Sequence, residues 1–331
     1  MIIDNVMYNN IDGIIEKPYG KMLLRYPENL IEKMNPVARH MARYACNAEI
    51  RFVTEAPTCF VSLMSEKGIA RVMVYYGDYA VAEHSLAEGK ITKIALDVPS
   101  VIANLGEDFY EGSMFSKNVW RLHLHGTISV CGIDTMNFAV RPPKKEEMPG
   151  KTMLSYGSSI SHGAGTTYMP MCYVKTLSRL LGVDCIAKGV GGSCFLEPEI
   201  ADSFAARSDW DFALLELGVN MVDDFETPEF EKRFIYFADK MYSTGKKLIF
   251  TTIYPNYAFF KDDAKHQRTL EFCDVIRKKC SEFDKSRVLL VEGKDVVTKT
   301  QMLTADGIHP STEGHVAMGY NLYEKVKEFL K

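Results

Sequence analysis

A serine and a histidine in the second half of the chain could act together as a nucleophile and its base. Ser159 follows an apolar segment that ends at Gly157, and His309 lies three residues after Asp306. A serine hydroxyl is a weak nucleophile until a base removes its proton, and an imidazole can be that base. A carboxylate can hold the imidazole in the required tautomer and stabilise the imidazolium. We therefore predict acyl transfer through an acyl-serine, with Ser159, His309 and Asp306 as the catalytic residues.

The same part of the chain offers donors for the negative oxygen of a tetrahedral intermediate. Such an oxyanion is stabilised by preorganised N–H groups. The backbone N–H of Ser159, the backbone N–H of Gly192 and the side-chain amide of Asn220 could supply three of them. A glycine suits position 192, because a backbone without a side chain lets the oxyanion approach closely. We predict an oxyanion hole made by these three residues.

These residues can meet only if the fold brings distant segments to one edge. From residue 152 onward, short apolar segments alternate with amphipathic ones, which is the pattern of a parallel sheet with helices on both faces. Ligands of such a sheet bind beyond the carboxyl ends of its strands. Strands are predicted over 152–157, 184–187, 211–218, 247–253 and 287–291. Helices are predicted over 168–182, 197–207, 228–245, 262–283 and 312–330.

The first half of the chain predicts a different sheet. Segments rich in Val, Ile, Phe and Tyr follow one another with turn residues and no long helix between them, which favours an antiparallel sandwich. A short helical stretch with an internal proline precedes them over 27–48. The predicted strands cover 51–55, 58–64, 69–76, 91–97, 119–125 and 127–133.

A segment dense in proline and charge, 141–151, separates the two patterns and is predicted to be a linker whose charges are solvated. We therefore expect two domains. An N-terminal antiparallel β-sandwich of the jelly-roll kind would cover 1–145. A doubly wound, flavodoxin-like α/β domain with a five-stranded parallel sheet would cover 150–331.

Four segments of the second domain resemble the motif blocks of the SGNH hydrolases, also called GDSL esterases. The Gly-Asp-Ser motif of that family is similar to 157–159, its second-block glycine to Gly192, its Gly-x-Asn-Asp motif to 218–221 and its Asp-x-x-His motif to 306–309. The resemblance extends over 152–331. It implies an SGNH-type fold, ester hydrolysis without a metal or organic cofactor, and the residue roles assigned above.

Two residues depart from the family's wording. Ser158 stands where the family has an aspartate before the nucleophile, and Met221 stands where it has an aspartate after the block-three asparagine. Neither replaced residue belongs to the hydrolytic machinery. Another residue near the nucleophile, His162, would either line the pocket or lie on a helix surface.

The loops near the nucleophile favour a small, polar substrate. The segments after the predicted strands are short, and residues such as Ser161 and Thr166 are small or polar. An added β-sandwich resembles the arrangement of carbohydrate esterases in the same superfamily. We expect hydrolysis of short-chain acyl esters, acetyl above all, on a small molecule or an oligosaccharide. A lipase or thioesterase for longer acyl chains, and a non-catalytic carbohydrate-binding protein, are the alternatives.

Composition argues against other partners. The 331 residues carry 39 Lys and Arg against 43 Asp and Glu, a net charge of −4, whereas nucleic acid and anionic membranes demand a basic surface. The N-terminus has no basic and apolar leader, and no run approaches the ~20 apolar residues of a membrane span. We therefore expect a cytoplasmic protein, and the sequence is compatible with a homo-oligomer.

Three further patterns favour structural explanations. The eight cysteines form no CxxC pair and lie mostly in apolar runs, which predicts buried thiols. The glycines over 189–192 lack the full G-x-G-x-x-G of a dinucleotide loop. His123 and His125 would share an exposed strand face with Arg121, opposite Trp120, and no cluster of further metal ligands is apparent in the sequence.

Overall fold

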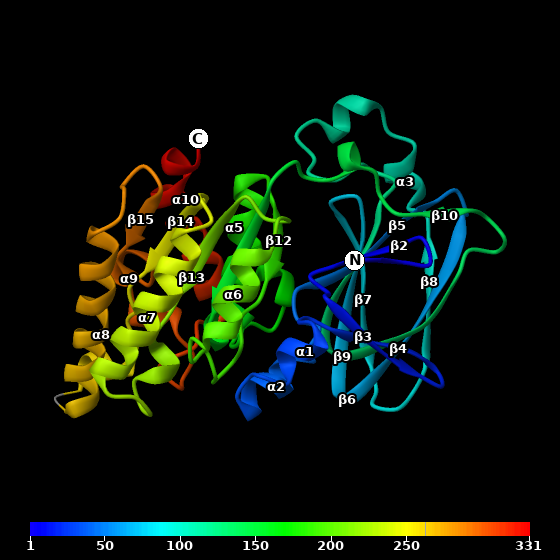
Figure 1. Cartoon of the computed structure of the whole chain (residues 1–331). Coiled ribbons are helices and arrows are strands. Elements are labelled where there is room, and N and C mark those ends of the chain that lie inside the picture. Colours follow the sequence, from blue (N-terminus) through cyan, green and yellow to red (C-terminus); the bar gives the residue numbers. More distant parts are fainter. Residues whose placement is uncertain (262) are drawn as a thin grey trace. The chain divides into compact units, whose positions relative to one another are not determined.

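The computed structural model describes residues 1–261 and 263–331, and its contacts divide the chain into two compact units. The β unit comprises residues 1–28 and 42–150. The α/β unit comprises residues 29–41 and 151–331, so a short segment from the first half of the chain packs with the second half. Figure 1 labels most of the elements of both units.

The α/β unit is built on a five-stranded sheet, as the sequence predicts. Its strands run in the order β12-β11-β13-β14-β15, and every neighbouring pair is parallel. The buried strands consist largely of apolar residues, because a sheet covered on both faces leaves no side for solvent. The strands are β11 (Thr152–Gly157), β12 (Asp184–Ala187), β13 (Phe212–Glu216), β14 (Lys247–Thr251) and β15 (Val288–Val291).

The helices of this unit form two groups around the sheet (Figure 1). In one group α6 packs on α7 and α7 on α8, and in the other α5 packs on α10. These helices are α5 (Tyr173–Leu181), α6 (Pro198–Ala206), α7 (Thr227–Tyr242), α8 (Ala264–Ser281) and α10 (Thr312–Leu330). All five match predicted helices, although position 262, the predicted start of one of them, lies outside the described residues. Shorter helices are α1 (Glu28–Ile31), α2 (Pro36–Ala42), α4 (Ser159–His162) and α9 (Gly293–Val296).

The β unit is antiparallel, again as predicted. Its strands join into one ten-stranded sheet, and the pairs that its named strands make all run antiparallel. Its buried core consists of inward-facing side chains such as Ile50, Leu63 and Trp120. The strands are β1 (Ile2–Ile3), β2 (Val6–Asn9), β3 (Gly13–Lys17), β4 (Gly20–Leu24), β5 (Ala48–Thr54), β6 (Thr58–Tyr76), β7 (Tyr79–Leu86), β8 (Thr92–Asp97), β9 (Trp120–Asp134) and β10 (Val140–Arg141). A short helix, α3 (Ser100–Ala103), follows β8.

Two pairs of predicted strands are continuous in the structure. The segments over 58–64 and 69–76 form the single strand β6, and those over 119–125 and 127–133 form β9. The residues that predicted a turn at 66–68 instead make irregular pairing, with register shifts between Ser65 and Arg71. Such bulges bend a strand without ending it. The short strands β1 to β4 were not predicted.

The face of β9 that was predicted to be exposed is covered. Trp120 is buried on the expected face, but His123 on the opposite face is only 2% exposed. Beside it, the Arg121 guanidinium donates to both carboxylate oxygens of Glu49, at 2.9 and 3.0 Å, and stacks 3.7 Å from the centre of the Phe115 ring. The prediction was wrong because β9 is a central strand, with an ion pair and an aromatic ring above its second face.

The predicted linker also holds local structure. A 3-10 turn covers Lys145–Glu147, and the Glu147 carboxylate accepts from both terminal nitrogens of Arg141 at 2.7 Å. These hydrogen bonds lower the pKa of Glu147 to about 2, against the opposing effect of partial burial. The charge at Glu147 is therefore engaged in an ion pair, unlike the solvated charge that was predicted.

The cysteines match their prediction. All eight are buried except Cys131, which is partly exposed. Within the described residues, no helix has the length and apolar character needed to cross a membrane.

Candidate active site

The nucleophile candidate sits on a sharp turn after β11, the second strand of the sheet. Ser158 is the N-cap of α4, and its hydroxyl oxygen accepts from the backbone N–H of Ile160 at 3.1 Å. Ser159 is therefore the first residue of a short helix that starts where the strand ends. From there its hydroxyl oxygen lies 2.8 Å from Nε2 of His309, a hydrogen-bonding distance.

The other side of the imidazole is held by a carboxylate. Nδ1 of His309 lies 2.7 Å from Asp306 Oδ2, while Asp306 Oδ1 accepts from the backbone N–H groups of Ile308 and His309 at 2.9 and 3.0 Å. Partial burial works against the charged form, but these hydrogen bonds, with one from Thr304, hold the pKa of Asp306 well below its ordinary value. The carboxylate thus stays ionised and fixes a hydrogen on Nδ1, which leaves Nε2 to accept from Ser159.

The structure also brings the predicted oxyanion donors to this edge. The side-chain oxygen of Asn220 accepts from the backbone N–H of Cys194 at 3.2 Å, and this bond fixes which end of the amide is the oxygen. The NH₂ end is then the donor available to a ligand. Gly192 adopts a left-handed φ of +68°, and a β-carbon there would meet no atom within 4 Å. Glycine is needed at position 192 for its backbone conformation, in addition to the open approach that was predicted.

One cavity of about 490 Å³ joins these groups. Beside Ser159, His309, Gly192 and Asn220, it is bounded by apolar and polar side chains. Among the lining residues, Lys265 pairs with Asp223 at 2.6 Å and donates to the Tyr257 hydroxyl at 2.5 Å. The other lining residues are Ala164, Val219, Val222, Asp224, Asn256, Ala258, Thr269 and Ile308.

The two residues that depart from the family's wording are buried. Met221 is fully buried, so its side chain lies in the core and does not form a pocket wall. The hydroxyl of Ser158 donates to the carboxylate of Glu216 at 2.7 Å. His162 is also buried, with Nδ1 placed 3.2 Å from the carbonyl oxygen of Gly189, so neither the pocket-lining nor the helix-surface prediction for it is correct.

Sequence reasoning missed two features of the site. Glu216 is a buried carboxyl group at the end of an otherwise apolar strand, and that exception to the pattern was the signal that could have found it. The segment 29–41 could not have been found in this way. Its Asn35 donates to the Glu197 carboxylate at 2.6 Å, and its Met41 lies beside Gly191, next to Ser159.

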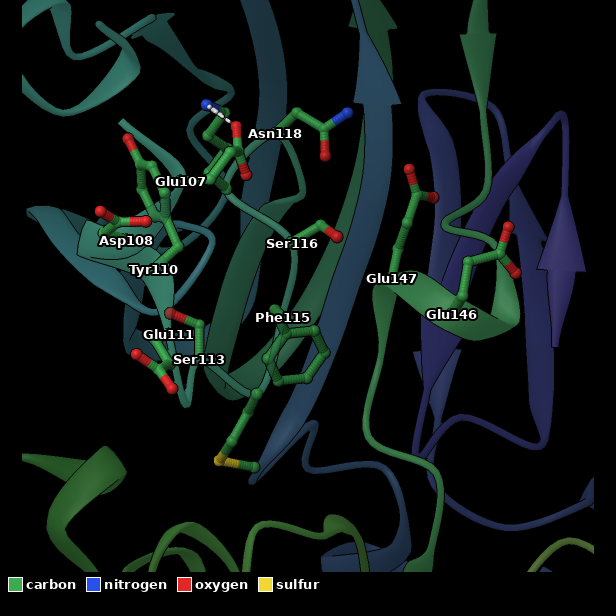
Figure 2. Close-up of a pocket in the computed structure, with 12 residues that line it drawn as sticks. Glu107, Asp108, Tyr110, Glu111, Ser113, Phe115, Ser116, Asn118, Glu146 and Glu147 are labelled. Carbon is green, nitrogen blue, oxygen red and sulfur yellow. Dashed lines mark hydrogen bonds and ion pairs between the residues drawn. The ribbon is translucent and has the colours of Figure 1, made fainter. Parts of the chain in front are cut away.

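A second cavity, of about 660 Å³, lies in the β unit (Figure 2). Its walls carry Glu107, Asp108 and Glu111 on one side and Glu146 and Glu147 on the other. It contains serines but no histidine among its lining residues, so it offers no imidazole base for a nucleophile. Of these two cavities, the one at Ser159 is the one that joins a serine to an imidazole.

Comparison with known proteins agrees with this geometry. Residues 150–327, more than half of the chain, match the GDSL-like Lipase/Acylhydrolase family. The fold and the family define the class, which is that of serine hydrolases acting on ester bonds. The chain belongs to the GDSL-like lipase/acylhydrolase family. No protein with curated annotation matches the sequence significantly.

Solved structures share the fold over nearly the whole chain. The salicylyl-acyltransferase SsfX3 of a tetracycline biosynthetic pathway has a TM-score of 0.78 at 13% identity, covering 98% of this chain and 95% of that one. A GDSL-like lipase from Bacteroides ovatus has a TM-score of 0.69 at 15% identity, covering 98% of each chain. A family two carbohydrate esterase from Clostridium thermocellum, in complex with cellohexaose, has a TM-score of 0.65 at 14% identity, covering 98% and 99%. At these identities the likeness establishes the fold.

Proposed function

We propose that this protein hydrolyses short-chain acyl esters, with acetyl esters of carbohydrates or similar polar alcohols as its preferred substrates. The observation that carries the proposal is the continuous line of hydrogen-bonding groups from Ser159 through His309 to Asp306. The same line opens into the cavity that contains Gly192 and Asn220.

In the first half of the reaction, Ser159 Oγ attacks the ester carbonyl carbon while Nε2 of His309 takes the hydroxyl proton. The negative oxygen accepts hydrogen bonds from the backbone N–H groups of Ser159 and Gly192 and from the Asn220 amide. The bond to the alcohol oxygen then breaks, and His309 gives its proton to that oxygen. The products of this half are the free alcohol and an acyl-Ser159.

In the second half, water attacks the acyl-Ser159 carbonyl and gives a proton to His309. The bond to Ser159 Oγ breaks, Ser159 recovers the proton, and the carboxylic acid leaves. Asp306 remains ionised throughout and stabilises the imidazolium form of His309 in both halves. Besides the ester and water, these steps use side chains and backbone groups of the chain.

The polar lining residues of the cavity support an alcohol that is rich in hydroxyls. Asp223, Asp224 and Lys265 line it and can exchange hydrogen bonds with sugar hydroxyls. Two structures with this fold carry related names, the carbohydrate esterase bound to cellohexaose and an acetyl xylan esterase from Butyrivibrio proteoclasticus. Those names describe the other proteins, and the transfer of their substrate class to this chain is part of the proposal.

The size of the cavity favours a second candidate. About 490 Å³ exceeds what an acetyl group needs, and Val219, Val222, Ala258 and Ile308 give part of the wall an apolar surface. A longer acyl chain would bury carbon against that wall, which is the lipase or thioesterase alternative. If the acyl group is acetyl, the alcohol part of the ester occupies most of this volume.

The test is kcat/KM for acetyl, butyryl, octanoyl and palmitoyl esters, together with acetate release from acetylated oligosaccharides. We expect the acetyl ester to be best and acetate to be released. The Ser159→Ala variant is the matched control and should release none. A maximum at the octanoyl or palmitoyl ester without acetate release would overturn the short-chain proposal in favour of the second candidate. Equal turnover by the control would overturn serine catalysis itself.

A further inference from the structure

We propose that Glu216 is a positioning residue for the nucleophile, because its buried carboxyl group ties the turn that carries Ser159 to the strand that leads to Asn220. The proposal rests on the function proposed above and adds a residue to it. No motif of the sequence analysis singled this glutamate out, and it does not line the cavity.

The carboxyl group lies directly beneath the turn. Glu216 ends β13 and pairs in register with Gly157, the last residue of β11. Its Oε2 accepts from the backbone N–H of Ser158 at 2.8 Å, from the Ser158 hydroxyl at 2.7 Å and from the Ser161 hydroxyl at 3.0 Å. One carboxylate oxygen therefore collects three donors from the four residues that begin with Ser158.

The space around this oxygen shows how closely the two strands approach. A β-carbon on residue 157 would lie 2.6 Å from Glu216 Oε2 and 2.5 Å from the Ser161 hydroxyl oxygen. Real β-carbons do not come so close to other atoms, so only glycine permits the contact. The backbone carbonyl oxygen of Glu216 would also lie 2.6 Å away, so glycine at 157 is explained by the close approach of both the backbone and the carboxyl group of Glu216.

Hydrogen bonds connect Glu216 to the helix turn that carries Ser159, and the chain itself connects it to the segment that carries Asn220. The Ser158 hydroxyl that donates to Glu216 also accepts from Ile160 N–H as the cap of α4, which fixes the first turn of the helix where Ser159 sits. On the other side, the chain leaves Glu216 and reaches Asn220 four residues later. Movement of the carboxyl group would shift the nucleophile relative to an oxyanion donor, and misplacements of this kind are costly to catalysis.

The surroundings of Glu216 make its charge responsive to pH. It is 1% exposed, and burial raises its pKa to about 7, even though the hydrogen bonds from Ser158 and Ser161 oppose that change. Ionisable groups with electrostatic contact to it include Tyr173 on α5, Tyr254 after β14 and Cys194 in the loop after β12. Burial raises the pKa of all three, so they stay neutral near pH 7 and place no further negative charge beside Glu216.

The test is the Glu216→Gln variant, which keeps the shape and an acceptor oxygen but cannot ionise. We expect kcat to fall by roughly ten- to a hundredfold with little change in KM, because the substrate does not touch this residue. In the wild type, loss of the Glu216 proton should contribute a rise in kcat/KM as the pH passes through about 7, and this contribution should be absent from the variant. Glu328→Gln, an exposed glutamate near the end of α10, is the control and should match the wild type.

A second variant covers the case in which Glu216→Gln does not fold. Ser161→Ala removes one of the three donors and leaves the carboxylate in place. Because that donor lowers the pKa of Glu216, its loss should move the acid limb of the profile to higher pH. An acid limb and a kcat that are unchanged in both variants would overturn the proposal. If Ser159→Ala is inactive in the same assay, the proposed function survives that outcome; if Ser159→Ala is fully active, it is the proposed function that fails.

Discussion

The side-chain oxygen of Asn220 is occupied by the backbone N–H of Cys194, 3.2 Å away. The amide can therefore only donate toward the cavity. A neutral donor suits an oxyanion, because it is preorganised and does not titrate. Asn220 is tied in this way to the loop that also supplies Gly192.

Replacement of Asn220 by alanine should lower kcat by roughly 10²–10³ and leave KM nearly unchanged, since one oxyanion donor is lost. Asn220→Asp offers a stricter version, because the isosteric carboxylate cannot donate and would repel the negative oxygen. Steady-state kinetics on a short-chain ester decide the matter. A rise in KM at constant kcat would assign Asn220 to substrate binding instead.

The Asp306→Asn variant should lose activity on the order of 10³ or more. An amide in place of the carboxylate can present its NH₂ to Nδ1 and so favour the tautomer that carries the hydrogen on Nε2, where it cannot accept from Ser159. The pKa of Asp306 is held well below its ordinary value, so in the wild type its protonation should not contribute to the loss of rate between pH 5 and 8. Wild-type-like kcat in this variant would show that another group orients the imidazole.

Gly192→Ala should cost both stability and rate. The β-carbon meets open space, but the left-handed backbone at φ +68° is strained for alanine, by about 1 kcal/mol or more. Relief of that strain would turn the N–H away from the oxyanion. Gly182→Ala is a matched control, because Gly182 has φ +65° and equally open surroundings at the end of α5, away from the cavity. We expect the two variants to lose similar amounts of thermal stability, and we expect kcat to fall only in Gly192→Ala. Equal kcat in both variants would contradict the role of Gly192.

Glu216 should make the stability of the protein depend on pH. Burial raises its pKa from 4.5 to about 7, so the unfolded chain releases this proton at a lower pH than the folded protein does. As the pH rises through the window between these two pKa values, deprotonation favours the unfolded state. The free energy of unfolding of the wild type should therefore fall by about 3 kcal/mol relative to that of Glu216→Gln. Denaturant unfolding of both proteins at pH 4.5 and pH 8 measures the difference. If the difference in unfolding free energy between the two proteins does not change with pH, the pKa of Glu216 in the folded protein is not raised.

The sequence predicted the α/β unit well because its signals are local. Each of β11 to β15 is a short apolar run followed by an amphipathic helix, and topology then places Ser159 and His309 at the same edge. Ser159, His309 and Asp306 were chosen as nucleophile, base and orienting acid from residue type and position. The structure places them within hydrogen-bonding distance of one another, and their catalytic roles stay a prediction.

The features that were missed depend on partners distant in sequence. The bend within β6 follows from its pairing with β9, which no local turn signal reveals. The position of Glu216 beneath Gly157 depends on the register of two strands. The segment 29–41 follows β4 of the β unit yet packs in the α/β unit, and nothing in its composition indicates which surface it covers.

The central claim is that Ser159 forms the covalent acyl intermediate. The most direct test treats the protein with a fluorophosphonate and locates the label by mass spectrometry, in the wild type and in Ser159→Ala. The account predicts a single label on Ser159, complete loss of ester hydrolysis on labelling, and neither label nor hydrolysis in the variant. A label on another residue, or hydrolysis that survives in Ser159→Ala, would contradict it.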